Sequence, residues 1–312
     1  MVSLLPPVLF AAAPAGLLLA ALLAGGPDSG RGAVLAAAAL AVGARESGLN
    51  AWSVRRRGTR PPPGSERHIR IVAWNTEYWH QHDDPGQFYE YLRGLDADIY
   101  LLQEYICHVG QWRFRLLDDD ARLFTAFPGY HVTVTGQLVT ISRLPVASVA
   151  AMSGEDILRV DVEAADGGPV LSTYNLHIPV QIGPYSPFTR QFYRVLREQA
   201  GERDRQLRQL AADVAQNAGP VVVAGDFNAS AAVGDVRRLE AVLTDAIRAH
   251  GSIYPVSWNC HRRLLRMWRL DWAFVSGGVR VRRYEFLDPG GRSDHCVQRL
   301  LVTVDAAPGP GR

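Results

Sequence analysis

Six short acidic and amide-rich motifs occur in this chain, and each follows or sits within a run of apolar residues typical of a β-strand. They lie at residues 71–75, 99–104, 172–177, 221–228, 270–275 and 293–295. Ligand sites in mixed α and β proteins form where strand ends meet, so we expect these motifs to bring polar side chains together. One such motif would carry little weight. Six of them predict that side chains at the strand ends meet around a metal and a phosphate.

The region from residue 68 to 305 alternates between short apolar runs and amphipathic stretches. Residues 69–74, 98–103, 130–134, 136–142, 147–151, 157–162, 170–176, 221–224, 269–275 and 297–304 predict strands, and residues 87–95, 198–217 and 236–249 predict helices. Strands and helices mixed in this way predict an α+β fold with two packed sheets flanked by helices.

Residues 1–52 have a different composition from the rest of the chain. Residues 4–25 are apolar throughout, which is enough for one bilayer crossing of about 20 residues. A second apolar stretch at residues 33–44 is about half as long. A cleaved signal peptide is the alternative, but no basic residue precedes the first stretch. We therefore predict one or two transmembrane helices over residues 1–52 and a location at the cell membrane of a bacterium.

A basic and proline-rich linker is predicted at residues 53–67, because three consecutive arginines are followed by three consecutive prolines. The positive-inside tendency would place this flank in the cytoplasm. We expect a hydrolase domain over residues 68–305 and a disordered tail over residues 306–312.

Overall charge gives no sign of nucleic-acid binding, because the net charge is +2 and near neutral. All 33 basic residues are Arg, which together with abundant Ala indicates a GC-rich genome. The three cysteines, Cys107, Cys260 and Cys296, show no spacing typical of a zinc site, and we expect three unpaired thiols.

Two of the motifs suggest proton transfer and phosphate binding. Asp226 and Asn228 leave an apolar strand through Gly225, so Asp226 can orient or deprotonate a water and Asn228 can donate to a phosphate oxygen. The alternative is a strand-ending Asx turn. His295 follows Asp294, and Asp271 can fix its tautomer. The alternative there is a histidine hydrogen-bonded in the core.

A metal ligand is predicted at Glu104, which ends an otherwise apolar run where an unpaired carboxylate would cost several kcal/mol. Hard oxygen ligands suit Mg²⁺, with Mn²⁺ as the alternative. Asn75 ends its own strand in the same way and could either bind the metal or hold Glu104.

Taken together, these motifs resemble those of the endonuclease/exonuclease/phosphatase superfamily, the metal-dependent hydrolases related to pancreatic deoxyribonuclease. The resemblance is carried, in family order, by residues 74–75, 103–104, 136–145, 225–228, 270–271 and 293–295. It implies a four-layer α/β/β/α sandwich with one active site across the top of both sheets.

The resemblance also implies a role for each polar residue. Glu104 would be the principal metal ligand, with Asn75 and Asp294 as assisting ligands. Asp226 would position or deprotonate the attacking water, and Asn228 would hold the phosphate. His295 with its partner Asp271 would stabilise negative charge, and His177 would contact the phosphate or donate a proton. Glu77 occupies a position where some members carry an acid near the metal.

A membrane anchor on such a hydrolase resembles the membrane-bound bacterial branch of the family, which includes teicoplanin-resistance-type proteins. This resemblance implies an extracytoplasmic domain acting on lipid-linked phosphate, which conflicts with the positive-inside reading. The loop at residues 178–193 carries Tyr185, Phe188 and Phe192 and could form a lipid-facing lip, or it could simply pack on the domain surface.

Three functions remain open at this point. The first is a membrane-anchored Mg²⁺-dependent phosphoesterase that hydrolyses a phosphomonoester, a phosphodiester or a lipid-linked pyrophosphate by in-line water attack. The second is a metal-dependent nuclease. The third is a non-catalytic binding module on the same scaffold. We expect the protein to be a monomer.

Overall fold

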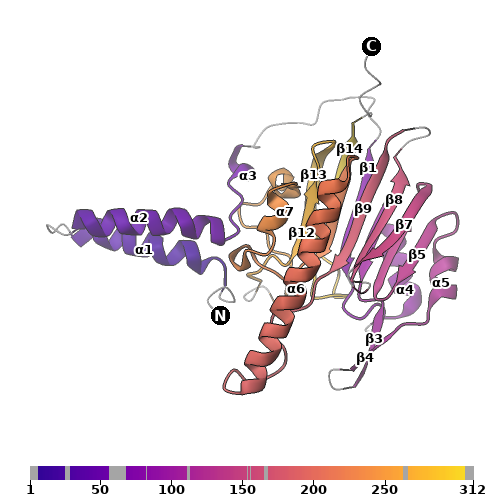
Figure 1. The fold of residues 1–312 in the computed structure, drawn as a ribbon, viewed down its shortest axis with the longest axis horizontal. Helices are drawn as coiled ribbons and strands as arrows, with labels where there is room; N and C mark the ends of the chain where they lie inside the picture. The colour runs from indigo at the N-terminus through magenta and orange to yellow at the C-terminus, as the bar shows by residue number, and fades with distance from the viewer. Residues whose placement is uncertain are drawn as a thin grey trace, which may run out of the picture.

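Two six-stranded sheets form the body of the protein (Figure 1). The computed structural model describes residues 6–24, 29–55, 68–81, 83–110, 113–152, 154, 156–164, 168–262 and 266–305. The first sheet has the order β13 (Val279–Leu287), β14 (Val297–Val304), β1 (Ile69–Asn75), β2 (Ile99–Gln103), β6 (Leu138–Ser142), β5 (His131–Thr135). The second has the order β11 (Thr244–Asp245), β12 (Asp271–Val275), β10 (Val221–Asp226), β9 (Val170–His177), β8 (Ile157–Glu163), β7 (Val146–Met152).

Both sheets are mixed in the same way. β1 and β2 run parallel in the first sheet, β9 and β10 run parallel in the second, and the other neighbours are antiparallel. Parallel strands end at one edge of a sheet, and an antiparallel neighbour begins at that edge. The ends of β1, β2, β9 and β10 and the starts of β12 and β14 therefore provide six places for side chains along two adjoining edges.

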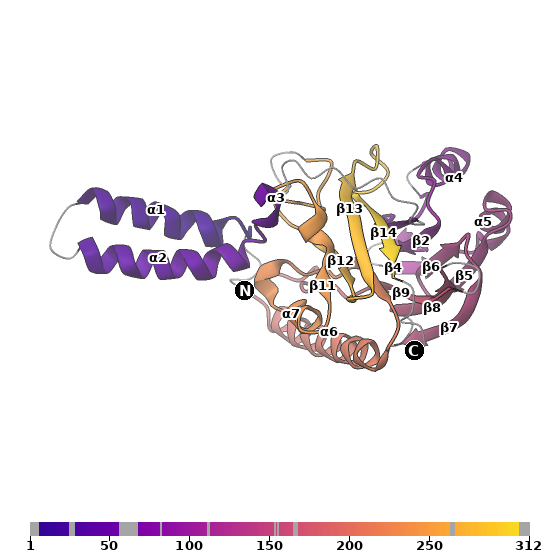
Figure 2. The same ribbon diagram turned by 90° about the horizontal axis from the view of Figure 1, so that it is seen from above.

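Three hydrophobic clusters separate the layers. Ile71 and Ala73 of β1 face the second sheet, whereas Val72 and Trp74 face the helices α4 (Pro85–Gly94) and α5 (Asp120–Ala126). A third cluster packs the outer face of the second sheet against α6 (Arg190–Gln216) and α7 (Arg237–Glu240). This alternation along buried strands gives a helix layer, two sheets and a second helix layer (Figure 2).

Local hydrogen bonds fix where the two longer domain helices begin. The side chain of Asp84 accepts from the backbone N–H of Gln87 at the start of α4, and Thr189 accepts from Phe192 at the start of α6. Helix α6 thus begins at Arg190, before the predicted residue 198. Phe192 is buried within this helix and does not belong to a loop.

A predicted helix over residues 236–249 is wrong. The chain instead forms the short α7, the edge strand β11 and the 3-10 turn η4 (Ala246–Ala249). Asp245 is the reason, because its carboxylate accepts from the N–H of Ile247 and forms a two-bonded ion pair with Arg269. Strand β13 and the small hairpin of β3 (Ile106–Gly110) and β4 (Arg113–Leu116) are further elements that the sequence pattern did not predict.

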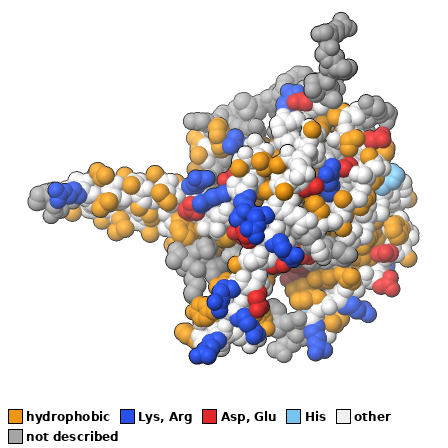
Figure 3. Space-filling view, viewed as in Figure 1, with side chains coloured by type: hydrophobic (Ala, Val, Ile, Leu, Met, Phe, Trp, Pro, Cys, Tyr) orange, Lys and Arg blue, Asp and Glu red, His pale blue; other side chains and the backbone are white. Residues whose placement is uncertain are grey.

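At the N-terminus, α1 (Leu9–Ala24) and α2 (Ser29–Glu46) pack as a pair that projects from the sheets, followed by the short α3 (Trp52–Arg55) (Figures 1 and 2). The two long helices approach closely at Gly43, where a Cβ atom would lie 1.7 Å from the carbonyl oxygen of Phe10. Figure 3 shows apolar side chains along the length of this arm.

The expectation of a transmembrane helix, and of the cell-membrane location that rested on it, is wrong. Within the described ranges, no helix combines the length and the apolar character that a bilayer crossing requires. Helix α1 has 16 residues, about 24 Å at the usual rise, whereas the hydrocarbon core is about 30 Å thick. Helix α2 has 18 residues but includes Arg31, Arg45 and Glu46.

The segment after α2 is attached to the domain by buried polar contacts. The Asn50 side chain donates to the carbonyl oxygens of Ile247, His250 and Ser252, and its backbone N–H donates to Ile253. Residues 56–67 and 306–312, which include most of the predicted linker and the predicted tail, lie outside the described residues. The domain boundaries stay predictions.

Candidate active site

The registers of the central strands place the predicted residues side by side. In the second sheet, Asp226 pairs with His177 on β9 and with Asp271 on β12. In the first sheet, Asn75 pairs with Gln103, and Glu104 follows directly. Paired positions on neighbouring strands point to the same face. The end of each strand therefore brings its polar side chain to one common place.

Asn75 connects the two sheets at this place. Its Nδ2 donates to Oε1 of Glu104 at 3.0 Å and to Oδ2 of Asp226 at 3.1 Å, and its Oδ1 accepts from the N–H of Glu77 at 3.0 Å. The amide thus holds a carboxylate from each sheet in a fixed relation. This is the holding role considered from the sequence; direct metal ligation by Asn75 stays a prediction.

His177 lies between the two carboxylates. Its Nε2 is 3.8 Å from Oε1 of Glu104 and 3.6 Å from Oδ2 of Asp226. Its Nδ1 is 2.8 Å from Oε1 of Gln137, so the Nδ1–H group donates to Gln137 and this bond orients the ring. Gln137 had no assigned role in the sequence analysis, although it lies within the motif at residues 136–145.

His295 forms a buried pair with Asp271. The Nδ1 atom is 2.9 Å and 3.1 Å from the two oxygens of the Asp271 carboxylate, while Nε2 is 3.7 Å from Oδ2 of Asp226. Burial by itself would lower the pKa of His295, but the carboxylates of Asp271 and Asp226 raise that pKa well above its ordinary value. His295 therefore carries positive charge beside Asp226.

Asp294 is held from both sides. Its Oδ2 accepts from the indole N–H of Trp258 at 2.8 Å, and its backbone N–H donates to Oε2 of Glu77 at 2.7 Å. Trp258 was not identified from the sequence, because it lies in a loop far from the other motifs. Its contact fixes the direction in which the Asp294 carboxylate points.

Strained backbone is concentrated around these residues. Glu77, Tyr78, Glu104 and Asn228 have φ values of 51°, 69°, 65° and 46°. Such left-handed conformations cost of the order of 1 kcal/mol each outside glycine. Hydrogen bonds to neighbouring site residues offset this cost, including Tyr78 N–H to Glu104 Oε2 at 3.0 Å and Asn228 N–H to Asp226 Oδ1 at 2.7 Å.

Gly225 is required by its surroundings. It has a φ of 154°, and a Cβ atom there would lie 2.1 Å from the carbonyl oxygen of Leu176. The glycine lets β9 and β10 approach closely just before Asp226. Asn228, two residues after Asp226, donates from Nδ2 to the carbonyl oxygen of Ile178 at 3.0 Å. The second hydrogen on this Nδ2 can bind a phosphate oxygen.

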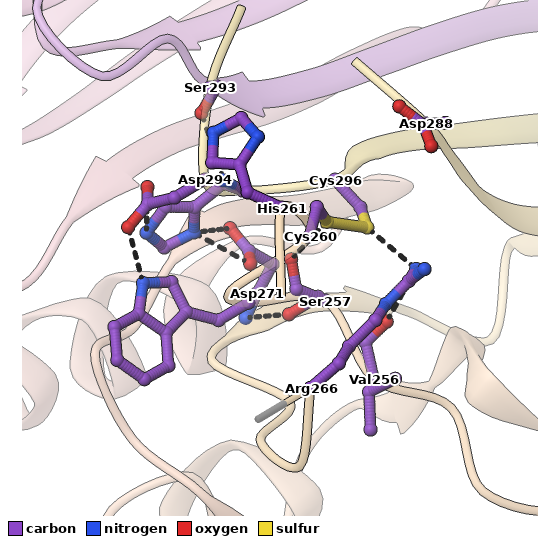
Figure 4. The surroundings of a disulfide bond; sticks show 12 residues. Val256, Ser257, Cys260, His261, Arg266, Asp271, Asp288, Ser293, Asp294 and Cys296 are labelled. Atoms are coloured by element: carbon purple, nitrogen blue, oxygen red, sulfur yellow. Dashed lines mark hydrogen bonds and ion pairs between the residues drawn. A yellow bond between two sulfur atoms is a disulfide. The ribbon is translucent and has the colours of Figure 1, made fainter. Parts of the chain in front are cut away.

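A disulfide bond joins Cys260 to Cys296, the residue after His295 (Figure 4). The expectation of three unpaired thiols is therefore wrong, and among the three only Cys107 is free. The two half-cystines are 36 residues apart and meet because the loop that carries Trp258 folds over the start of β14. Backbone bonds from Cys260 to Asp294 and from Cys296 to Ser257 run beside the bridge.

One cavity of about 760 Å³ opens over these residues. We call Asn75, Glu104, His177, Asp226, Asn228, Asp294 and His295 the polar floor, and we call Tyr78, Ile106, Phe114, Val180, Ile182, Pro184, Trp258 and Trp268 the apolar rim; all of them line the cavity. Among the described residues that line it, none is Arg, and the chain has no Lys.

The donor set fits a divalent cation. Glu77, Glu104, Asp226 and Asp294 bring carboxylates to one cavity, and like charges so placed favour a bound cation. Ligand atoms of Asp226, Asp271 and His295 also lie within 4.8 Å of one another. Asp271 and His295 already satisfy each other by hydrogen bonding, so Glu104 and Asp294 are the better candidates to hold the ion.

A family model described as Endonuclease/Exonuclease/phosphatase family matches residues 50–295. The chain belongs to this family. Its members are metal-dependent and are usually hydrolases of phosphate esters. The match spans every residue of the polar floor.

Solved structures share the fold at low identity. An endonuclease/exonuclease/phosphatase from Beutenbergia cavernae has a TM-score of 0.57 at 18% identity, covering 79% of this chain and 74% of that one. A mannosyl-6-phosphatase from Bacteroides thetaiotaomicron has a TM-score of 0.53 at 16% identity, covering 75% and 99%. Truncated TDP2 from Caenorhabditis elegans has a TM-score of 0.51 at 18% identity, covering 76% and 98%. No curated protein matches the chain.

Proposed function

We propose that this protein is a Mg²⁺-dependent hydrolase of phosphate esters, acting on a phosphomonoester or phosphodiester by in-line attack of water. The observation that carries the proposal is the position of Asp226. Its Oδ2 is 3.6 Å from His177 and 3.7 Å from His295, and the carboxylate is 1% exposed. A base held between two imidazoles, beside the metal-ligand candidate Glu104, suits the activation of water next to a phosphorus atom.

Each residue of the polar floor has a part in this reaction. Asp226 orients the attacking water and accepts its proton. His295, kept cationic by Asp271, and His177 stabilise the negative charge that develops on the phosphate oxygens. Asn228 holds a phosphate oxygen. Glu104 and Asp294 would hold Mg²⁺, with Mn²⁺ as the alternative ion, and the ion when bound supplies Lewis-acid stabilisation of the phosphate.

The charge of the cavity favours a small ester over nucleic acid. A protein that follows a polynucleotide backbone neutralises several phosphates with Lys or Arg. The described lining of this cavity has five acidic residues and no Arg. A single phosphate over a bound metal is compatible with this negatively charged cavity, whereas a chain of phosphates is not. A lipid-linked phosphate, as considered from the sequence, is one of the esters that a substrate panel tests.

The test is a panel of bis(p-nitrophenyl) phosphate, p-nitrophenyl phosphate, polyprenyl pyrophosphate and plasmid DNA, each with Mg²⁺ or with EDTA. We expect hydrolysis of at least one of the first three, lost in EDTA and reduced at least about 10²-fold in Glu104→Gln. Nicking of the plasmid alone would identify a nuclease. Binding of Mg²⁺ without turnover of any substrate would identify a binding module.

A further inference from the structure

The cavity extends beyond the polar floor. Its volume of about 760 Å³ lies within the range of sites for whole organic ligands, which runs from about 300 to 1,000 Å³. A phosphate group alone fills only a small part of this space. The remainder has room for another part of the substrate, and its lining indicates the chemistry of that part.

Two separate segments provide most of the apolar rim. On the β3–β4 hairpin, Phe114 stacks on Tyr78 with ring centroids 5.5 Å apart and planes 15° apart. After His177, the loop presents Val180 and Ile182 to the same cavity. Phe114 is 45% exposed and Ile182 is 42% exposed, so both offer apolar surface that a ligand could cover.

The amide side chains that line the cavity above the floor are engaged with the protein. Gln181 donates to the carbonyl oxygen of Asn228 at 2.7 Å, and Gln137 bonds to both His177 and Asp156. In the orientation that satisfies its neighbours, Gln199 donates to the carbonyl oxygens of Val180 and Gln181. Part of the hydrogen-bonding capacity of these amides is therefore used within the protein, whereas the apolar rim offers surface that only an apolar group covers favourably.

We propose that this cavity selects phosphate esters in which the phosphorus carries an apolar ester group, seated against Phe114 and Ile182 while the phosphate lies on the polar floor. The proposal rests on the proposed function, because it assigns a substrate class to the same site. Burial of the group removes apolar surface from water on both the ligand and the rim. Specificity in this site then comes from the two loops and not from the strand ends.

The test is a series of soluble p-nitrophenyl phosphodiesters whose second ester group is methyl, butyl or phenyl, assayed with the full chain and Mg²⁺. In every member water forms the new bond to phosphorus, and the bond to p-nitrophenolate breaks. Because one buried methylene is worth about fourfold, we expect kcat/KM for the butyl ester to exceed that for the methyl ester at least about tenfold. Equal values across the series would overturn the proposal.

Variants locate the effect on the rim. Phe114→Ser and Ile182→Ser should each reduce the ratio of butyl to methyl kcat/KM at least about threefold, and Phe114→Leu should restore most of it. Val149→Ser is the control, because Val149 is 49% exposed on β7 and does not line the cavity. An unchanged ratio in both Ser variants would also overturn the proposal. Loss of EDTA-sensitive turnover for every ester would instead count against the proposed function.

Discussion

The polar floor and the apolar rim of the cavity are built in different ways. Every residue of the floor lies at the end of a strand or within three residues of one, and Asp226 and Asn75 are each 1% exposed. Most of the rim comes from the β3–β4 hairpin and from loops, and Phe114 and Ile182 are each more than 40% exposed. One part of the site is fixed by sheet register, and the other by segments that pack on the surface.

Hydrogen bonding shows the same difference. Below the floor, Asn175 of the second sheet donates to the carbonyl oxygens of Leu102 and Val139 in the first and accepts from Gln103 at 2.6 Å. These buried bonds join the two sheets directly under the polar floor. A substitution in the floor therefore disturbs chemistry that the whole sandwich positions, whereas a substitution at Phe114, Val180 or Ile182 of the rim changes only a contact with substrate.

Asp226→Asn should have the largest effect. Asparagine retains an oxygen to accept from the N–H of Asn228 but cannot take a proton from water, so we expect kcat to fall about 10³-fold or more at unchanged fold. Steady-state kinetics on the best ester of the panel, with thermal unfolding as the check on fold, measures this. A loss below about tenfold would mean that another group activates the water.

Asp271→Asn should have the next largest effect. Asp271 does not line the cavity, but its charge holds His295 protonated and its oxygens orient the ring. We expect kcat to fall about 10²-fold with little change in KM. Asp161→Asn is the control, because Asp161 is also a buried carboxylate in an ion pair, with Arg159 at 2.8 Å, but is remote from the cavity lining. That variant should lose stability and keep kcat.

The floor could be predicted from the sequence, because its residues follow directly from strand patterns. An acid or amide after a buried apolar run marks a strand end, and Asn75, Glu104, His177, Asp226 and His295 all meet where such ends meet. What the sequence did not provide was any contact formed by a loop. Gln137 and Trp258 orient site residues through single side-chain bonds that leave no periodic pattern.

Elsewhere, tertiary contacts overrode local patterns. The helical periodicity at residues 236–249 is real, but the ion pair of Asp245 with Arg269 turns the chain into an edge strand. The cysteine pairing depends on a loop closing over 36 residues, which spacing alone does not reveal. The apolar stretch at the N-terminus suggested a bilayer crossing, yet its described helix, Leu9–Ala24, has 16 residues.

The disulfide links a residue next to His295 of the floor with a residue near Trp258 of the rim. Its removal should have an intermediate effect. The bridge joins Cys260, two residues after Trp258, to Cys296, two residues after Asp294, and the indole of Trp258 holds the Asp294 carboxylate. In the double variant Cys260→Ser, Cys296→Ser, we expect the free energy of unfolding to fall by about 3 kcal/mol, measured in urea. We expect kcat to fall about tenfold, because the position of a metal-ligand candidate is loosened.

Two comparisons sharpen this third prediction. Cys107→Ser removes the free cysteine, which lies on β3 and takes no part in the bridge, and should leave both quantities unchanged. Treatment of the unmodified protein with dithiothreitol should reproduce the double variant. If kcat stays constant while stability falls, the backbone bonds from Cys260 to Asp294 and from Cys296 to Ser257 are sufficient to hold the loop.

Val180→Ser should have the smallest effect and separates the rim from the floor most directly. Val180 is 46% exposed and lines the cavity, but none of the strand ends depends on it. A partly buried methyl group or two contributes about 1 kcal/mol or less to binding, so we expect KM for the butyl p-nitrophenyl phosphodiester to rise about threefold. The value of kcat should not change, because the phosphate still lies on an intact floor. A fall in kcat comparable to that of Asp271→Asn would mean that the rim also positions the reacting atoms, and that floor and rim are not independent.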